Sequence, residues 1–400
     1  MEIAIIGAGA SGMAAAIAAS AVGTNTVTLF ERQARVGKKL LATGNGRCNL
    51  SNRGAGIEHY HGADPSFVLP ALKEFPVEKT LELFRALGLY TVTEDSGRVY
   101  PYSDQANSVV DVLRFALDRS NLHLRTATEI TGVRHDRGGF LLRAGEERFR
   151  AEKLIVACGG AAGGKLGGGL SGYQLLRSLG HHCTRLYPSL VQLKTNAELV
   201  RSLKGVRANA RLQLLLNDSL IFEAAGEVQF TEYGVSGPAV FDLSRAASTA
   251  GECELHLDLL PDLPGEALLS ELCIRISRFP ALLCEDLFTG ILHNRLGRVV
   301  IRACDTPLNT PITELNWKQL NAIVNTCHDF VFRVLGTTGM DNAQVTAGGI
   351  CTQEFFAETM ESRIVPGLYA AGEVLDIDGD CGGFNLQWAW SSGLLAGQLR

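Results

Sequence analysis

Short apolar runs, glycine-rich turns and helical segments follow one another at the start of the chain. Residues 3–6 are apolar and lead directly into Gly7-Ala8-Gly9-Ala10-Ser11-Gly12. An Ala-rich segment over 13–22 stops at Gly23, and a second apolar run follows at 27–30. A continuous apolar run of this length is typical of a buried strand. The pattern therefore predicts a strand, a tight turn, a helix and a second strand.

Helical and strand spacings continue through the N-terminal half. Apolar residues at helical spacing predict helices within 66–90 and over 108–119. Short apolar runs predict strands at 122–126, 130–133, 140–143 and 154–157. The last run leads into a glycine-rich tract over 159–172. We favour backbone that passes beneath a ligand over a flexible linker here, because a buried strand leads into the glycines.

From about residue 188 the pattern changes to short strands and then to short helices. Strands are predicted at 190–194, 210–216, 219–223, 227–231 and 253–257, which suits a small antiparallel barrel or sandwich. Helices broken by prolines are predicted at 259–276, 279–293, 295–303 and 317–320. Strand patterns return at 343–350 and 367–373, before a glycine loop at 379–383 and a helix over 384–399.

This order of elements predicts an α/β fold. We expect a Rossmann-like dinucleotide-binding domain with an inserted antiparallel β-barrel domain and a small helical domain. The expected boundaries are 1–188 with 340–400 for the cofactor domain, 189–258 with 325–339 for the barrel or substrate domain, and 259–324 for the helical insert. The chain opens with one phosphate-binding unit and closes with a second strand-loop-helix, which suits an extended dinucleotide held at both ends. We expect the N-terminal helix to bind the pyrophosphate and the C-terminal helix to bind the far ring.

The first glycine turn has the G-x-G-x-x-G pattern of dinucleotide-binding proteins. Gly7 permits the tight turn, Gly9 lets backbone N–H groups approach a pyrophosphate, and Gly12 lets the helix pack against the strand. The helix N-terminus adds positive potential. Glu31 ends the second strand, where a carboxylate binds the hydroxyls of an adenosine ribose. The pattern alone is weak, but this context predicts dinucleotide binding.

Composition and charge narrow the class of protein. The chain has 400 residues, 20% charged and 46% hydrophobic, with a net charge of −5. This composition is typical of an ordinary globular protein. The net charge gives no general reason to expect nucleic acid or an anionic membrane as a partner. No apolar run approaches the roughly 20 residues of a membrane span, so we expect a cytoplasmic protein. The ten cysteines form no C-x-x-C pair and are expected to be reduced thiols.

A polar loop follows Glu31. Residues 32–52 are rich in Gly, Lys, Arg and Asn, and Thr43-Gly44-Asn45-Gly46 places two glycines beside small polar residues. Such backbone can pass close to a ligand, and Lys38, Lys39 and Arg47 add positive charge. We favour a ligand loop over a solvated surface loop, because the segment directly follows the adenine-binding half of the motif.

Longer motifs carry a family resemblance over nearly the whole chain. They are VGKKLL (36–41), TGNGRCN (43–49) with Asn52, GRVYP (97–101) with Ser103, FT (230–231) with GVSGP (234–238), QVTAGG (344–349), GEVLD (372–376) and GGFNLQWA (382–389). By these motifs the chain resembles the bacterial flavoproteins grouped as the BaiN/RdsA family, earlier named HI0933-like. The resemblance implies FAD as the cofactor and NAD(P)H as a transient electron donor.

The closing helix also favours a flavin. A reduced flavin carries negative charge near N1 and the C2 carbonyl, and a helix N-terminus aimed there stabilises it. Following the family, Glu373 or Asp376 serves the ribityl chain and backbone near Ile130 contacts adenine. The expected FAD-binding residues are Gly7, Gly9, Ala10, Ser11, Gly12, Glu31, Arg32, Lys39, Thr43, Gly44, Asn45, Gly46, Ile130, Ala157, Gly159, Gly160, Gly372, Glu373, Asp376, Gly383, Phe384, Asn385 and Leu386.

Catalytic candidates lie beside the cofactor loop and in a second family motif. They are Arg47, Cys48, Asn49 and Tyr100. Cys48 is a possible redox thiol, but we favour a packing role because no second cysteine is near in sequence. Asp376, Asp378 and Asp380 form one acidic loop with no partner histidine, which favours a solvent-facing loop over a metal cluster. No metal site is expected.

Three functions follow from the resemblance. The family includes enzymes implicated in reducing conjugated C=C bonds in bile-acid-type steroids and in a uracil of ribosomal RNA, and one described as an aminoacetone oxidase. We favour NAD(P)H-driven reduction of an activated C=C bond over an amine oxidase that produces hydrogen peroxide. A third hypothesis is an RNA-associated flavoprotein with a mainly structural cofactor. Its basis is the basic stretch of Arg201, Lys204, Arg207 and Arg211. We favour a solvated rim for this stretch over a patch for a polyanion, RNA or the phosphate tail of a reductant.

Overall fold

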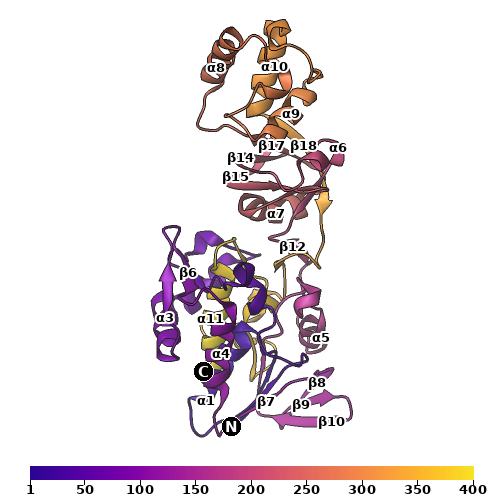
Figure 1. Cartoon of the computed structure of the whole chain (residues 1–400). Helices are drawn as coiled ribbons and strands as arrows, with labels where there is room; N and C mark the ends of the chain where they lie inside the picture. The colour runs from indigo at the N-terminus through magenta and orange to yellow at the C-terminus, as the bar shows by residue number, and fades with distance from the viewer. The chain divides into compact units, whose positions relative to one another are not determined.

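The chain folds into two compact units. A computed structural model describes residues 1–196 and 198–400 (Figure 1). The first unit comprises residues 1–187 and 340–400, and the second comprises residues 188–339. In the described part of the chain, no helix is both long and apolar enough to cross a membrane.

A five-stranded parallel sheet forms the centre of the first unit. Its strands lie in the order β20 (Leu368–Ala370), β11 (Lys153–Val156), β1 (Glu2–Ile6), β2 (Thr26–Phe30) and β7 (Leu122–Arg125). β1 pairs in parallel with both β2 and β11, and its residues 3–6 are buried. The short apolar runs are therefore buried strands, and the predicted Rossmann-like sheet is confirmed.

Helices from both ends of the chain pack together beside this sheet. α1 (Ala10–Ser20) contacts α11 (Phe384–Gly397), and the two lie side by side in Figure 1. A Cβ on Gly393 would overlap the Ser11 carbonyl, and one on Gly397 would overlap backbone of Ala15. Glycine at these positions therefore lets the two helix backbones approach closely. The unit's other helices are α2 (Leu69–Glu74), α3 (Val77–Ala86), α4 (Ala106–Leu117) and α5 (Ser171–Ser178).

Three small sheets complete the first unit. β8 (Gly132–Asp136), β9 (Gly139–Ala144) and β10 (Glu147–Ala151) form an antiparallel meander. β6 (Arg98–Pro101) lies between β3 (Ser51–Asn52) and β5 (Thr91–Thr93). β4 (Tyr60–His61) pairs with β21 (Asp378–Gly379) and so joins two segments that are distant in sequence. Two further short strands are β12 (Tyr187–Ser189) and β19 (Val345–Ala347).

The second unit is a closed six-stranded barrel with helices. The strand order is β13 (Leu193–Thr195), β16 (Gly234–Ser236), β15 (Ser219–Phe230), β14 (Arg207–Leu216), β17 (Cys253–Asp258) and β18 (Phe330–Thr337). Burial alternates along β18, as expected when one face of a strand fills a barrel interior. The predicted barrel is confirmed, and the alternative prediction of a sandwich is wrong. The helices are α6 (Ala197–Val200), α7 (Pro238–Ala250), α8 (Gly265–Arg278), α9 (Asn294–Ala303) and α10 (Trp317–His328).

Two helical segments of this unit differ from expectation. The helix expected over 279–293 is wrong, since this segment holds turns and one short 3₁₀ turn at Cys284–Asp286. Its ends carry Pro280 and Gly290, which disfavour helix. Helix α7 was not predicted, although Pro238 stands at its first turn and Val240, Leu243 and Ala247 are buried at helical spacing. The separation into barrel domain and helical insert stays a prediction, and both parts share one hydrophobic core.

Candidate functional site

Of the three motif glycines in the turn after β1, only Gly9 has open space where a side chain would stand. A Cβ on Gly7 would overlap the backbone of Ala157 and Cys158, which follow β11, and a Cβ on Gly12 would overlap the Gly7 carbonyl. Around Gly9, by contrast, no described atom lies within 4 Å of where a Cβ would stand. Gly7 and Gly12 are thus required by packing, whereas the space at Gly9 is available to a ligand. The backbone there can approach a diphosphate closely.

Glu31 is fixed beside this turn at the end of β2. Its Oε2 atom accepts the Ala8 N–H (2.9 Å) and its Oε1 atom accepts the Gln33 N–H (2.8 Å). A carboxylate has about four acceptor sites, so lone pairs remain for the two hydroxyls of a ribose. The structure therefore fixes the Glu31 carboxylate beside the glycine turn, and its binding of a ribose stays a prediction.

The two central helices point their N-termini the same way. Ser11 packs against Gly393 and Ala15 against Gly397, so α1 and α11 run parallel. Ser11 and Gly393 lie at the same height along the two helices. Helix α1 begins one residue before Ser11, whereas α11 begins nine residues before Gly393. At 1.5 Å per residue, α11 starts about 12 Å farther out than α1. Two aligned helix starts at such an offset suit the two ends of an extended dinucleotide.

Both of these helix starts have backbone N–H groups to offer a ligand. Gly9 and Gly383 are the N-cap residues, and within the described structure neither start has a side-chain cap or an acidic residue in its first turn. The first N–H groups of a helix have no partner within the helix, and the helix dipole favours negative charge there. The residues present therefore fit a diphosphate at α1 and an electron-rich ring at α11.

The loop containing Thr43, Gly44, Asn45 and Gly46 meets the start of α11 through Asn49. A Cβ on Gly44 would lie 2.8 Å from the Asn49 N atom, and one on Gly383 would lie 2.8 Å from Asn49 Oδ1. Asn49 Oδ1 is buried and has no hydrogen-bond partner among the described residues. An orphaned acceptor between two predicted cofactor segments is the second observation that fits a bound flavin.

Glu373 and Lys39 form an ion pair under the glycine tract. Lys39 Nζ lies 2.7 Å from Glu373 Oε2, and Glu373 Oε1 accepts the Thr346 N–H (2.9 Å). Gly160 lies against the same carboxylate, and Gly372 lies against the side chain of Ser11. Both oxygens of Glu373 therefore have partners, and the ion pair fixes the Lys39 side chain.

The remaining predicted cofactor residues lie around the same sheet edge. Ala157 follows β11 and packs against Gly7, while Gly159 begins the glycine tract. The Arg32 guanidinium donates to the carbonyls of Gly167 (2.6 Å) and Gly168 (3.1 Å), so it stabilises the backbone of the glycine tract. Ala10 and Ser11 start α1, and Phe384, Asn385 and Leu386 start α11.

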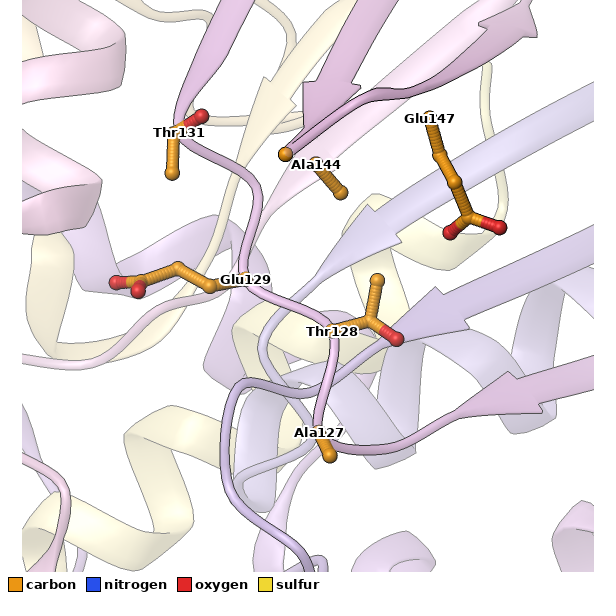
Figure 2. A pocket seen from close by; sticks show the side chains of 7 residues that line it. Ala127, Thr128, Glu129, Thr131, Ala144 and Glu147 are labelled. Carbon is orange, nitrogen blue, oxygen red and sulfur yellow. The ribbon is translucent and has the colours of Figure 1, made fainter.

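Ile130 is a core residue beside a surface pocket. Its side chain is buried, and the pocket of about 340 Å³ is lined by Ala127, Thr128, Glu129, Thr131, Ala144, Gly145 and Glu147. Figure 2 shows loop 127–131 passing Ala144, with the Glu129 and Glu147 side chains directed to opposite sides. The Thr128 N–H donates to the Glu31 carbonyl (2.9 Å), so this loop lies beside the predicted ribose site. Adenine contact near Ile130 stays a prediction.

The acidic loop before α11 is buried, and the expectation that it faces solvent is wrong. Asp376 is 4% exposed and Asp378 is 0% exposed. Asp380 has two histidine partners, His59 Nδ1 at 3.0 Å and His61 Nε2 at 2.7 Å. Burial raises the pKa of Asp380, but hydrogen bonds from His61 and His59 outweigh it and the net pKa is lowered. The β4–β21 pairing produces this cluster across 321 residues, so no local signal revealed it.

The catalytic candidates Arg47 and Tyr100 contact each other. The Arg47 guanidinium lies 4.0 Å from the Tyr100 ring centroid, bonds to Asp104, and donates to Glu94 (3.2 Å). Burial, and then the Glu94 charge, raise the pKa of Tyr100. A Cβ on Gly44 would lie 3.3 Å from the Tyr100 ring. This pair therefore adjoins the cofactor loop.

Cys48 has the properties of a core residue. Its side chain is 0% exposed, and burial raises its pKa to about 11. A redox thiol needs thiolate character and access, and Cys48 has neither. These properties favour the packing role.

The basic stretch of the second unit is paired with acids. Lys204 lies 2.7 Å from Glu232, Arg207 lies 3.2 Å from Glu227, and Arg211 lies 4.0 Å from Glu223. These partners come from β15 and the residues just after it. The local positive charge is thus largely balanced, which weakens the case for a polyanion patch.

Known proteins resemble this chain in sequence and in fold. The profile of the family described as HI0933-like protein Rossmann domain matches residues 1–399. The 3-dehydro-bile acid delta(4,6)-reductase of Clostridium scindens is 40% identical over 99% of this chain and 98% of its own length. The ribosomal RNA dihydrouridine synthase of Escherichia coli is 31% identical over 97% of this chain and 95% of its own length. The 3-ketosteroid delta1-dehydrogenase from Sterolibacterium denitrificans shares the fold, with TM-score 0.50 and 13% identity over 99% of this chain and 98% of that one.

Proposed function

The chain belongs to the HI0933-like family and is an FAD-dependent oxidoreductase, and we propose that it reduces an activated C=C bond of a small apolar enone with electrons from NADH or NADPH. The full-length similarity to the bile-acid reductase is the observation that carries the choice of reaction. The arrangement of α1 and α11 supports the choice of cofactor.

We assign each part of FAD to different residues of the chain. The start of α1 would hold the diphosphate, Glu31 would hold the adenosine ribose, and Lys39 with Glu373 would support the middle of the cofactor. The start of α11 and Asn49 would receive the pyrimidine end of the flavin, where reduction places negative charge. Bound FAD supplies hydride transfer through its N5 atom.

Tyr100 is our candidate for the proton that the reaction also needs. Reduction of a C=C bond adds a hydride to one carbon and a proton to the other. The Tyr100 hydroxyl is protonated at neutral pH, as an ordinary tyrosine is, since burial raises its pKa further. The ring adjoins the cofactor loop at Gly44. Arg47 covers the ring face and fixes its orientation.

An anaerobic test separates the proposed reaction from amine oxidation. Holoenzyme is mixed with NADH, NADPH or aminoacetone, and bleaching of the flavin is followed. We expect a nicotinamide to bleach the flavin, and an enone to restore its colour without oxygen. Bleaching by the amine alone, with hydrogen peroxide formed in air, would replace the reductase proposal with the oxidase.

A uracil in ribosomal RNA is a second activated C=C bond that this chemistry could reduce, as the name of the E. coli relative suggests. We place the small enone first because carboxylates pair with Lys204, Arg207 and Arg211. Reoxidation of the reduced holoenzyme by unmodified ribosomal RNA, and by no enone in the panel, would reverse this order.

A further inference from the structure

Arg98 on β6 is a half-buried cation without a partner. In the part of the chain that the structure describes, its guanidinium makes neither an ion pair nor a hydrogen bond. The other half-buried arginines of the described chain have partners, and Arg32 and Arg275, for example, donate to backbone carbonyls. Partial removal of a charge from water is unfavourable when no counterion is present. A negatively charged group of a ligand would offset that cost.

The pairing of β3 with β6 fixes the position of Arg98. Arg98 and Asn52 lie opposite each other in antiparallel register, so their side chains share a face. A Cβ on Gly382 would lie 3.4 Å from Asn52 Nδ2 and 3.6 Å from Arg98 Nε. Asn52 Nδ2 also donates to the Gly382 carbonyl (2.9 Å). The Arg98 side chain therefore lies beside the glycine loop that leads into α11.

Tyr100 lies on the same face of β6 as Arg98. The two residues are two positions apart, which places their Cα atoms about 7 Å apart with side chains on one side of the strand. Tyr100 adjoins the cofactor loop at Gly44. Burial raises the pKa of Tyr100, and the charge of Arg98 opposes that rise, as expected for neighbouring groups. Strand β6 thus presents a cation and a phenol to the two predicted cofactor segments.

Reduction of an activated C=C bond needs a positive charge as well as a proton donor. Addition of a hydride from reduced FAD to the β carbon moves the electron pair of the C=C bond toward the carbonyl group. Negative charge then collects on the carbonyl oxygen, and the resulting enolate takes a proton at its α carbon. The α carbon is bonded to the carbonyl carbon, so the group that holds the oxygen must lie next to the group that gives the proton. Arg98 and Tyr100 meet this requirement.

We propose that Arg98 is a catalytic residue that binds the carbonyl oxygen of the substrate and stabilises the enolate, while Tyr100 protonates the α carbon. Solvent then returns a proton to Tyr100, so both residues are unchanged after each turnover. This inference rests on the proposed function, and it adds the residue that binds the oxygen on which charge develops. The backbone N–H groups at the start of α11 are assigned to the flavin in that function, which leaves Arg98 for the substrate.

Binding of an oxyanion probe tests Arg98 without turnover. The probes are para-chlorophenol, which can bind as its phenolate, and para-chloroanisole, which has the same ring and no ionisable hydroxyl. Both are titrated into oxidised holoenzyme, and bound phenolate is followed by its charge-transfer absorption with the flavin. Arg98→Gln should raise the Kd of the phenol about tenfold to hundredfold, as for a lost charge-assisted hydrogen bond. The Kd of the anisole should change less than about twofold.

Two further variants control for charge and for folding. Arg98→Lys keeps the charge but loses the planar guanidinium, so it should retain part of the preference for the phenol. Arg85→Gln is the matched control, because Arg85 is an exposed arginine beside Tyr90, just before β5. It should bind both probes as the wild type does. Flavin content and thermal unfolding confirm that each variant is folded.

Rate and potential measurements separate a role at the substrate from a role at the cofactor. Prereduced Arg98→Gln enzyme should reduce an enone about 10²-fold to 10³-fold more slowly than the wild type, as when one oxyanion donor is removed. The midpoint potential of the flavin should stay at the wild-type value. A lower midpoint potential in Arg98→Gln, with unchanged affinity for both probes, would assign Arg98 to the reduced flavin and overturn the proposal.

The remaining outcomes distinguish this proposal from the proposed function. If the wild type reduces enones and Arg98→Gln keeps both the phenol affinity and the rate, Arg98 does not bind the oxyanion although the proposed function stands. If the wild type reduces no enone, the proposed function fails. The catalytic role of Arg98 then fails with it, even where the phenol still binds through Arg98.

Discussion

Tyr100 is the residue on which the proposed chemistry depends most. It is buried, its pKa is raised, and it lies under the Arg47 guanidinium next to the cofactor loop. A phenol is protonated at neutral pH, and the Arg47 contact fixes the ring, so the hydroxyl is available as a proton donor beside the cofactor loop.

Removal of this hydroxyl should slow reduction of the substrate. Tyr100→Phe keeps the ring under Arg47, and we expect the rate of enone reduction by prereduced enzyme to fall roughly 10²-fold to 10⁴-fold. Stopped-flow reoxidation of the flavin under anaerobic conditions measures this rate. Tyr102→Phe, two residues along the same strand, is the matched control. A Tyr100→Phe enzyme with the wild-type rate would require a different proton donor.

His181 is buried and forms a hydrogen-bonded triad with Glu354 and Ser362. Its Nδ1 atom lies 2.9 Å from Glu354 Oε2, its Nε2 atom lies 3.0 Å from Ser362 Oγ, and its ring stacks on Phe355. Burial lowers the pKa of His181 despite the opposing effect of Glu354. Hydrogen bonds from His182 and His181 lower the pKa of Glu354, although burial alone would raise it.

This triad should make the protein sensitive to acid. A histidine whose folded pKa is depressed contributes stability above its unfolded pKa, near 6.5, and loses it as the pH falls below that value. Glu354 acts in the same direction at lower pH. We expect the free energy of unfolding to fall between pH 7 and pH 5, and His181→Phe to flatten this dependence while lowering stability at pH 7 by about 1–3 kcal/mol.

Exposed His182 provides the control for this experiment. Its side chain is 81% exposed, so His182→Gln should leave most of the pH dependence in place. Urea unfolding at several pH values measures both variants. An unchanged slope in His181→Phe would show that other groups control acid sensitivity.

At the scale of elements, the pairing of α1 with α11 determines the site. Gly393 and Gly397 let the two backbones touch, and the uncapped starts of both helices face the same way. Strand β1 and the glycine turn position the first helix, while β4, β21 and the Asp380 cluster hold the loop before the second.

Two glycine substitutions should separate folding from cofactor binding. Gly9→Ala places a methyl group in open space, so the apoprotein should keep its stability while FAD affinity falls about tenfold to hundredfold through lost diphosphate contacts. Gly393→Ala places a methyl group against the Ser11 carbonyl, so the apoprotein should lose about 1–3 kcal/mol. Urea unfolding of apoprotein and FAD titration measure the two effects. The opposite pattern would mean that Gly9 serves packing.

Local signals explain which elements the sequence predicts correctly. The glycine turn, β1, β2 and α11 have their patterns within about twenty residues, so they can be identified without tertiary information. Strands β14 and β15 are longer than predicted, since the hairpin at Asn217-Asp218 joins continuous strands. The contacts between Lys39 and Glu373, and between His59 and Asp380, join residues more than 300 positions apart. No single-sequence pattern specifies such pairs.

At the scale of the whole molecule, the second unit places its basic stretch among carboxylates. Exposed ion pairs contribute little to stability, but they neutralise charge that would otherwise attract a polyanion. The barrel and its helices form one core of their own, so surface charges of this unit can be changed without disturbing the glycine turn.

Charge reversal at Arg201, Lys204, Arg207 and Arg211 should therefore leave enone reduction nearly unchanged. We expect kcat/KM for a small enone to stay within about twofold of the wild type. Steady-state kinetics at two salt concentrations measure this. Loss of a cellular role in the same variant, with enone reduction intact, would favour the RNA-associated hypothesis.

The central claim is that two parallel helix starts, one from each end of the chain, hold the two ends of a single FAD. A crystal structure of the holoenzyme tests it most directly. We predict the diphosphate within hydrogen-bond distance of the backbone at residues 9–11, and the pyrimidine edge of the flavin at the backbone of residues 383–386. A flavin ring located away from residues 383–386, or a diphosphate bound outside the glycine turn, would contradict the account.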